Sequence, residues 1–239
     1  MTTSSSGQPP TVDHYFSAQP ASATQLRQVS VELAGSVRAV SVASGVFSSA
    51  GIDRGTAVLL RTVAAPRHTG VFLDLGCGWG PLALTLALVS PEATVWAVDV
   101  NERALDLARR NASDLGVAVH AVRPEEVPAD LRFDVIWSNP PIRIGKAALH
   151  DLLRAWLPRL TPDGVAHLVV AKDLGADSLA RWLAQELGAS ELGASEVGGP
   201  EVGGSELGAE YEVARVATDK GFRVLSVTRR ASADAGRER

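Results

Sequence analysis

Residues 71–81, VFLDLGCGWGP, decide the fold of this chain. The first five are apolar except for Asp74, and a short apolar run of this kind is typical of a buried strand. Glycines at 76, 78 and 80 follow directly, and Pro81 opens an apolar stretch long enough for a helix to residue 89. A strand, a glycine-rich turn and a helix form the first unit of a doubly wound α/β fold, in which ligands lie at the carboxyl ends of the strands.

Further strands and helices alternate along the rest of the chain. We expect strands at 94–99, 117–122, 134–138 and 165–171, helices at 102–115, 147–157 and 176–187, and a closing strand pair at 212–216 and 222–229. Before them, residues 27–33 and 37–42 alternate as a hairpin does, and Asp53 is expected to cap a helix that ends before Pro66. The sequence therefore predicts an α/β fold: a doubly wound, mostly parallel seven-stranded, Rossmann-like sheet with a small N-terminal β-hairpin extension.

The composition divides the chain into four parts. Residues 1–24, rich in Ser, Thr, Pro and Ala, are expected to form a disordered tail, and residues 231–239 a second one. Residues 25–66 hold the hairpin and the helix, and residues 67–230 the main domain. Within that domain, residues 186–210 repeat Glu-(Leu/Val)-Gly-(Ala/Gly)-X, whose five-residue period suits neither helix nor strand. We expect a low-complexity insertion in solvent there, with an acidic interaction arm as the alternative.

Charge and residue usage limit the classes of function. The net charge is −4, but seven of the 27 acidic residues lie between 186 and 212, where there is no Lys or Arg. The remaining body is mildly basic, which is compatible with RNA. No apolar run has the length of a membrane span, no signal peptide is recognisable, and the five histidines and single cysteine lack metal-ligand spacing. The sequence predicts a cytoplasmic protein without a metal or a membrane partner.

The glycine loop indicates the kind of cofactor. Its spacing is G-x-G-x-G, whereas a dinucleotide site has G-x-G-x-x-G. Asp99 ends the second strand, where a carboxylate can accept both hydroxyls of a ribose, so S-adenosylmethionine fits better than NAD. Asp99 could instead cap the next helix, and Asp74 could either cap or orient the loop and the amino-acid part of the ligand. The predicted cofactor-binding residues are Asp74, Gly76, Cys77, Gly78, Gly80, Asp99 and Val100.

Asn139 stands at the tip of the fourth strand, because Pro140 and Pro141 lack the backbone donor that a buried strand needs. Asn-Pro-Pro at this position resembles the motif of methyltransferases that act on planar exocyclic nitrogens. An exocyclic amine is a poor nucleophile, because its lone pair is delocalised into the ring. If the Asn139 amide oxygen and the Pro140 carbonyl accept its two N–H groups, the lone pair turns towards the methyl donor, and alignment alone can contribute about 7–11 kcal/mol at best. Asn139→Asp is then expected to be less damaging than Asn139→Ala, because a carboxylate also accepts.

Four motifs occur in a fixed order: Gly45-Val46-Phe47-Ser48, Gly51-Ile52-Asp53-Arg54-Gly55-Thr56, Asp74-Leu75-Gly76-Cys77-Gly78-Trp79-Gly80 and Ser138-Asn139-Pro140-Pro141. Together they resemble the small-domain methyltransferase family that includes bacterial 16S ribosomal RNA guanine-N2 methyltransferases. The resemblance implies a class I, S-adenosylmethionine-dependent enzyme with ribosomal RNA or the small ribosomal subunit as its partner. It implies catalytic roles for Asn139, Pro140 and Pro141, and substrate contacts for Phe47, Ile142 and Arg143.

One departure keeps other functions open. Many family members have an aromatic residue after Asn-Pro-Pro, whereas this chain has Ile142. The alternatives are methylation of adenine N6, methylation of a protein glutamine amide, and a non-catalytic RNA-binding relic of the fold.

Overall fold

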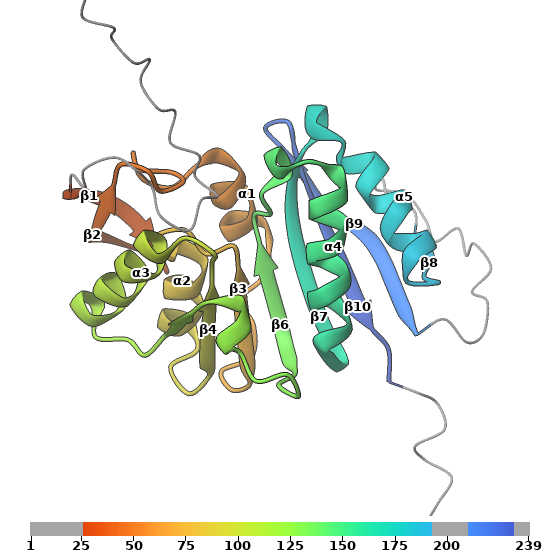
Figure 1. Cartoon of the computed structure of the whole chain (residues 1–239), viewed down its shortest axis with the longest axis horizontal. Coiled ribbons are helices and arrows are strands. Elements are labelled where there is room, and N and C mark those ends of the chain that lie inside the picture. The colour runs from red at the N-terminus through yellow and green to blue at the C-terminus, as the bar shows by residue number, and fades with distance from the viewer. Residues whose placement is uncertain (1–25, 193–209, 232–239) are drawn as a thin grey trace, which may run out of the picture.

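The apolar residues that follow Gly70 form β3, an inner strand of the main sheet between β4 and β6 (Figure 1). The computed structural model describes residues 26–192 and 210–231, and these form an eight-stranded sheet in the order β5-β4-β3-β6-β7-β10-β9-β8. The strands are β3 (Val71–Leu75), β4 (Thr94–Val98), β5 (His120–Val122), β6 (Phe133–Ser138), β7 (Leu160–Ala171), β8 (Ser190–Leu192), β9 (Tyr211–Asp219) and β10 (Phe222–Arg229). Only β10 pairs antiparallel with its neighbours β7 and β9, so the mostly parallel sheet is confirmed.

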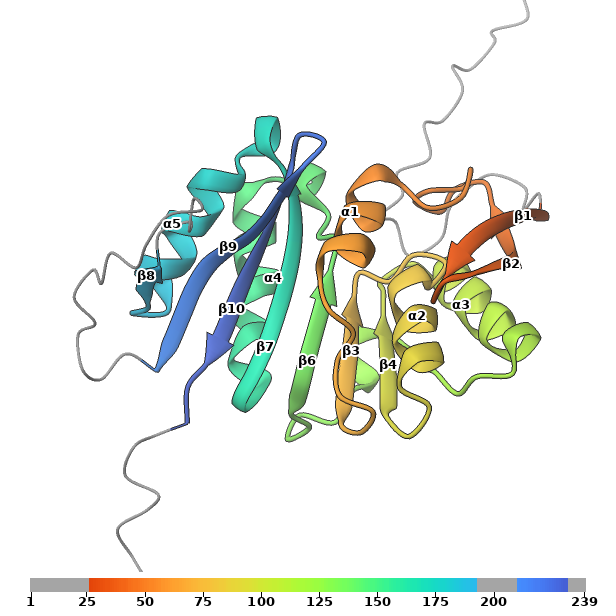
Figure 2. The same ribbon diagram turned by 180° about the vertical axis from the view of Figure 1, so that it is seen from behind.

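Helices cover both faces of the sheet (Figures 1 and 2). They are α1 (Arg54–Thr62), α2 (Pro81–Val89), α3 (Glu102–Leu115), α4 (Lys146–Trp156) and α5 (Ala176–Glu186), with 3₁₀ turns η1 (Pro124–Glu126), η2 (Ile142–Ile144), η3 (Leu157–Arg159) and η4 (Lys172–Leu174). Successive strand residues point to opposite faces, so Phe72 packs with α1 and α2 while Leu73 packs with α4 and α5. Asp74 shares the face of Phe72, which directs its carboxyl group towards α2.

All seven predicted strands are present, with two differences. β5 begins at His120 rather than at residue 117, because the Val117 N–H still bonds the Ala112 carbonyl where α3 ends at Gly116. β8 adds an eighth strand, parallel to β9, inside the segment that we expected to stay in solvent. Residues 186–192 of that insertion therefore belong to the folded body, whereas residues 193–209 and both predicted tails, except residue 231, lie outside the described residues.

The N-terminal hairpin forms a small sheet of its own. β1 (Leu26–Leu33) and β2 (Ser36–Ala43) pair antiparallel and pack their apolar side on α2 and α3, against the buried Trp79. Asn111 of α3 fastens β2: its Oδ1 accepts the Ser41 N–H at 2.7 Å, and its Nδ2 donates to the Ser41 and Trp79 carbonyls at 3.0 and 3.2 Å. This docking brings the segment after β2 to the glycine loop.

Candidate active site

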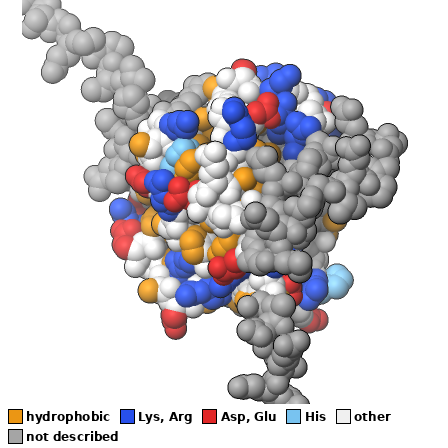
Figure 3. Space-filling view, turned by 90° about the vertical axis from the view of Figure 1, so that its right-hand side faces the viewer, with side chains coloured by type: hydrophobic (Ala, Val, Ile, Leu, Met, Phe, Trp, Pro, Cys, Tyr) orange, Lys and Arg blue, Asp and Glu red, His pale blue; other side chains and the backbone are white. Residues whose placement is uncertain are grey.

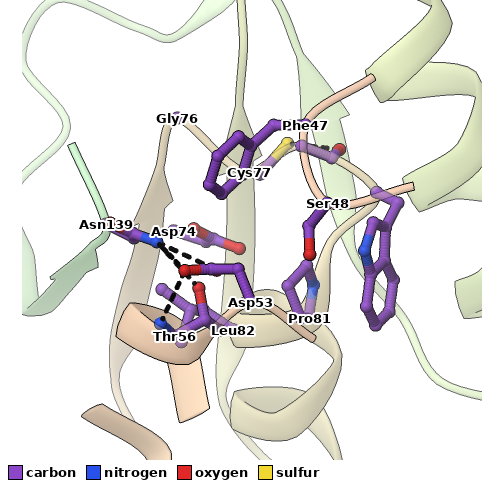
Figure 4. Close-up of a pocket in the computed structure, with 12 residues that line it drawn as sticks. Phe47, Ser48, Asp53, Thr56, Asp74, Gly76, Cys77, Pro81, Leu82 and Asn139 are labelled. Atoms are coloured by element: carbon purple, nitrogen blue, oxygen red, sulfur yellow. Dashed lines mark hydrogen bonds between the residues drawn. The ribbon is translucent and has the colours of Figure 1, made fainter. Parts of the chain in front are cut away.

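A pocket lies where the carboxyl ends of β3 and β6 meet the segment that joins β2 to α1 (Figure 4). The carboxyl ends of parallel strands share one edge of a sheet, so residues distant in sequence come together there. The residues that line the pocket are Phe47, Ser48, Asp53, Thr56, Asp74, Gly76, Cys77, Gly78, Trp79, Pro81, Leu82 and Asn139. Six of the predicted site residues are therefore side by side; Gly80, Asp99, Val100, Pro140, Pro141 and Ile142 are not among the lining residues.

The three loop glycines serve different purposes. All have a positive φ, of 76° at Gly76, 55° at Gly78 and 93° at Gly80, which residues with a Cβ rarely adopt. A Cβ at Gly80 would also lie 3.2 Å from the Ala108 Cβ, so this glycine lets α2 pack closely on α3. A Cβ at Gly76 or Gly78 would meet no atom nearer than 3.8 Å, so these two keep the pocket wall free of side chains.

Asp99 ties the glycine loop to the end of β4. Its Oδ2 accepts the Gly78 N–H and its Oδ1 accepts the Asn101 N–H, both at 2.9 Å, while burial raises its pKa. The cap of α3 is Asn101, whose Oδ1 accepts the Arg103 N–H at 3.1 Å. The alternative of Asp99 as the helix cap is therefore wrong. The Val100 side chain beside it is exposed to 42%.

Asp74 is a buried carboxyl group with one oxygen in use. Its Oδ2 accepts the Ala83 N–H at 2.9 Å, whereas Oδ1 has no hydrogen-bond partner within the part of the chain that the structure describes. Burial raises the pKa of Asp74 to about 8. A buried polar atom without a partner lowers stability by roughly 1–3 kcal/mol. A ligand that donates a hydrogen bond to Asp74 Oδ1 would remove this cost. Burial also raises the pKa of the neighbouring Cys77 thiol.

The end of β6 is held rigidly. The Ser138 hydroxyl donates to the Leu75 carbonyl at 2.6 Å, which fixes β6 against the end of β3. Pro141 has φ −74° and ψ 75°, and the Ile142 N–H donates to the Pro140 carbonyl at 2.8 Å. These values describe an inverse γ-turn centred on Pro141. The Pro140 carbonyl retains a second lone pair, as its predicted role requires.

The Asn139 side chain has a defined orientation (Figure 4). Its Nδ2 donates to both carboxylate oxygens of Asp53, at 3.1 and 3.0 Å, and lies 3.1 Å from the Thr56 hydroxyl. A carboxylate only accepts, so the atom that faces it is the amide nitrogen, and the amide oxygen points the other way. The sequence predicted Asp53 correctly as a helix cap, and its Oδ1 does accept the Gly55 and Thr56 N–H groups at 2.8 and 3.4 Å. It gave no sign that Asp53 and Thr56 contact Asn139.

The predicted substrate contacts differ in position. Phe47 lines the pocket with 43% of its surface exposed. Ile142 packs partly against the core beneath α4 instead, and the Arg143 side chain is not described. Trp79, the aromatic residue of the glycine loop, is fully buried and donates its Nε1–H to the Gly51 carbonyl at 3.3 Å. It therefore supports the segment that carries Asp53.

Outside the pocket, several charged side chains of the described residues are paired with one another. Acidic and basic side chains are interspersed on the side that carries α5 and β9 (Figure 3). Arg154 on α4 pairs with Glu186 at 2.7 Å and with Asp151 at 3.1 Å. Among residues 26–192 and 210–231, no cluster of His, Cys, Asp and Glu is arranged to hold a metal ion. Nor does any helix in these ranges have the length and apolarity to cross a bilayer.

Comparisons with known proteins show the family. The family model described as methyltransferase small domain matches residues 38–198. YbxB of Bacillus subtilis (strain 168), described as uncharacterized, is 32% identical over 170 residues, which are 70% of this chain and 85% of that protein. The ribosomal RNA small subunit methyltransferase C of Serratia proteamaculans (strain 568) is 35% identical over 132 residues, 52% of this chain. The match covers only 37% of that relative's length.

A solved structure shares the fold. The T. thermophilus 16S rRNA N2 G1207 methyltransferase (RsmC), in complex with AdoMet and guanosine, superposes with a TM-score of 0.65 and 22% identity. The superposition covers 88% of this chain and 52% of that chain. At this identity the likeness concerns the fold, and it confirms the predicted class I architecture. The family match confirms the predicted resemblance and the enzyme class, a methyltransferase.

Proposed function

The chain belongs to the methyltransferase small-domain family, and we propose that it methylates the exocyclic N2 of a guanine in ribosomal RNA, with 16S RNA as the first candidate. Its cofactor is S-adenosylmethionine, whose sulfonium supplies the methyl group when bound. The observation that carries the proposal is the orientation of Asn139, which directs an amide oxygen away from Asp53 at the end of β6.

The pocket residues fit this cofactor. Gly76 and Gly78 leave the wall free of side chains, and Asp74 Oδ1 is a buried acceptor without a partner among the described residues. Asp99 uses one acceptor site on each oxygen for a backbone N–H, and a carboxylate has further sites for ribose hydroxyls. We assign Asp74 to the amino-acid end of the cofactor and Asp99 to its ribose. The adenine moiety would then lie near Val100.

The two acceptors at the end of β6 account for the chemistry. The Asn139 amide oxygen and the Pro140 carbonyl accept the two N–H groups of an exocyclic amine; the γ-turn at Pro141 orients the carbonyl, and Asp53 orients the amide. The protein then contributes alignment rather than a base, which suits an amine of low basicity. We assign contact with the target base to Phe47, which lines the pocket with 43% of its surface exposed, and we keep Ile142 and Arg143, which follow the turn, as further candidates.

The names of the two relatives described above support ribosomal RNA as the partner. The Serratia protein is named for the small ribosomal subunit, and the T. thermophilus protein for N2 of a 16S RNA guanine. Neither name refers to adenine or to a protein amide. We propose the same substrate class for this chain, acting in the cytoplasm, on free RNA or on the small subunit.

Single-turnover methylation tests the proposal. The full-length protein, tritiated S-adenosylmethionine and 30S subunits from a strain lacking this gene should give label in 16S RNA, recovered as N2-methylguanosine. Asn139→Ala should retain cofactor affinity by calorimetry but transfer methyl about a hundredfold more slowly, because roughly 3 kcal/mol of transition-state alignment is lost. Transfer by this variant at the wild-type rate would refute the role of Asn139, and label in another nucleoside would refute the assignment to guanine N2.

A further inference from the structure

We propose that Asp53 is a positioning residue for methyl transfer: its carboxylate holds the Asn139 amide in the one orientation that presents oxygen, not nitrogen, to the target amine. The inference rests on the proposed function, because it concerns the same acceptor. It assigns a role to a side chain that sequence patterns identify only as a helix cap.

The contact is selective for one orientation of the amide. Both Asp53 oxygens lie 3.0–3.1 Å from Asn139 Nδ2. If the amide turned over, its oxygen would face two carboxylate oxygens, and acceptors would oppose acceptors without a proton between them. The Thr56 hydroxyl, 3.1 Å from Nδ2, can accept from the amide nitrogen or donate to the amide oxygen, so the selection rests on the carboxylate. The turned state would also present N–H donors to an amine that itself offers N–H donors, so it cannot align that amine.

Capping alone does not require this residue. The cap uses only Asp53 Oδ1, which accepts from the Gly55 and Thr56 N–H groups. Serine or asparagine would cap the helix about as well. The bond from Asn139 to Oδ2 at 3.0 Å is additional, and it joins two segments 86 residues apart. Aspartate differs from serine and asparagine in having two oxygens that only accept: Oδ1 caps the helix, and Oδ2 accepts from Asn139.

The residues on either side of Asp53 are packed against neighbouring elements. A Cβ at Gly55 would lie 3.1 Å from Phe222 Cε1, 3.2 Å from Asp53 Oδ1 and 3.3 Å from Asn139 Nδ2, so the first turn of α1 is pressed against both β10 and the tip of β6. Trp79 holds the Gly51 carbonyl just before it. The carboxylate therefore has little freedom to follow a moving amide.

The contact reverses one expectation from the sequence. Asn139→Asp keeps an acceptor, and from the sequence we expected it to be milder than Asn139→Ala. In the structure the new carboxylate faces Asp53 at hydrogen-bond distance, and two like charges so close repel each other. We now expect Asn139→Asp to lose about as much activity as Asn139→Ala.

An exchange of the two residues tests the proposal. Asp53→Asn combined with Asn139→Asp places an amide donor at position 53 and an acceptor at position 139, which restores a hydrogen bond between the two side chains with its direction reversed, and leaves position 139 with an oxygen for the target amine. The assay is single-turnover methylation of 30S subunits that lack the modification. We expect the methyl-transfer rate of Asn139→Asp to be about a hundredfold below wild type, and the rate of the double variant to be at least tenfold above that of Asn139→Asp. The KM for subunits should change less than kcat. No recovery in the double variant would overturn the proposal.

Asp53→Ser is the matched control, because it keeps a capping oxygen and shortens the side chain away from Asn139. We expect a wild-type Tm and cofactor affinity with a methyl-transfer rate lowered at least tenfold. An unchanged rate would show that Asp53 acts as a cap alone.

A second measurement needs no substrate. The Asn139 side-chain amide signal in a ¹⁵N-correlated NMR spectrum, assigned by its loss in Asn139→Asp, should shift and lose exchange protection in Asp53→Ser. If the Asn139 amide signal has the same position and the same exchange protection in wild type and in Asp53→Ser, the inference is overturned, whether or not any RNA is methylated. If wild-type protein transfers no methyl to 30S subunits while the signal responds as expected, the proposed substrate fails and the orientation of Asn139 by Asp53 stands.

Discussion

Replacing Asp74 by Asn is expected to stabilise the fold and to weaken cofactor binding at once. Burial raises the pKa of Asp74 from 3.8 to about 8. The folded protein therefore keeps a proton that the unfolded chain releases between about pH 4 and pH 8. Because the unfolded state binds fewer protons in this range, the free energy of unfolding falls as the pH rises, until Asp74 ionises in the folded state near pH 8.

The size of the effect follows from the shift. One pKa unit corresponds to about 1.4 kcal/mol, so Asp74 alone should lower the stability by roughly 2 kcal/mol between pH 6 and pH 8. The protonated carboxyl group and an amide have nearly the same shape, and the amide oxygen can still accept the Ala83 N–H. Asp74→Asn removes the titration without removing that bond, so its stability curve should lack this slope.

Urea unfolding at pH 6, 7 and 8 measures the difference, with other titrating groups common to both proteins. Wild type should lose about 2 kcal/mol relative to Asp74→Asn over this range at an unchanged m value. Calorimetry should show about tenfold weaker S-adenosylmethionine binding by the variant, because the ammonium group of the cofactor favours the ionised form of Asp74, and an amide cannot ionise. Parallel stability curves would refute the raised pKa, and equal affinities would remove Asp74 from the cofactor site.

Three other perturbations test separate parts of the structure. Asp99→Ala should weaken S-adenosylmethionine binding tenfold to a hundredfold in calorimetry, because the ribose loses its acceptor and Gly78 loses its anchor; unchanged affinity would exclude Asp99. Asn111→Ala should lower the free energy of unfolding in urea by about 2–3 kcal/mol, since it leaves Ser41 and Trp79 backbone groups unpaired, and a loss near zero would show that the hairpin docks without this clamp. Deleting residues 196–205 should leave the Tm and the methyl-transfer rate nearly unchanged, because halving a loop changes its closure entropy by only about 0.6 kcal/mol, whereas a clear loss would mean that the repeat packs on the body.

Most of the fold follows from local patterns in the sequence. The strand at 71–75, the helix at 81–89 and the helix end at Gly116 are each specified by residues within a few positions, and the structure places them there. β8 was missed for a different reason. Its three residues belong to a glycine-rich repeat with no strand period, and they form a strand only because β9 offers a free edge. Pairing with a strand that comes later in the chain leaves no local signal.

In the site, too, some residues could be predicted from local patterns and others depend on tertiary packing. Asp74, Asp99 and Asn139 end or follow buried strands, so the rule that ligands lie at the carboxyl edge of a parallel sheet was enough to select them. Asp53 ends no strand. It reaches Asn139 because α1 packs on β7 and β10 while the hairpin docks on α2 and α3, and no periodicity in residues 26–62 specifies either arrangement.

The acceptor and the cofactor loop are aligned by their common anchorage to one strand end. Ser138 bonds the Leu75 carbonyl, which fixes the tip of β6 to β3, and Gly76 continues from that same strand end with its N–H on the Val98 carbonyl. Trp79, three residues further on, holds Gly51 and so the approach to Asp53. The segments that carry Asp53, Asn139 and the glycine loop are therefore all bonded, directly or through Trp79, to the end of β3 and the loop that follows it. Because misalignment of a reacting pair by about 1 Å can cost a hundredfold in rate, this shared anchorage would keep the acceptor and the methyl donor in register in the reaction that we propose, which uses no catalytic base.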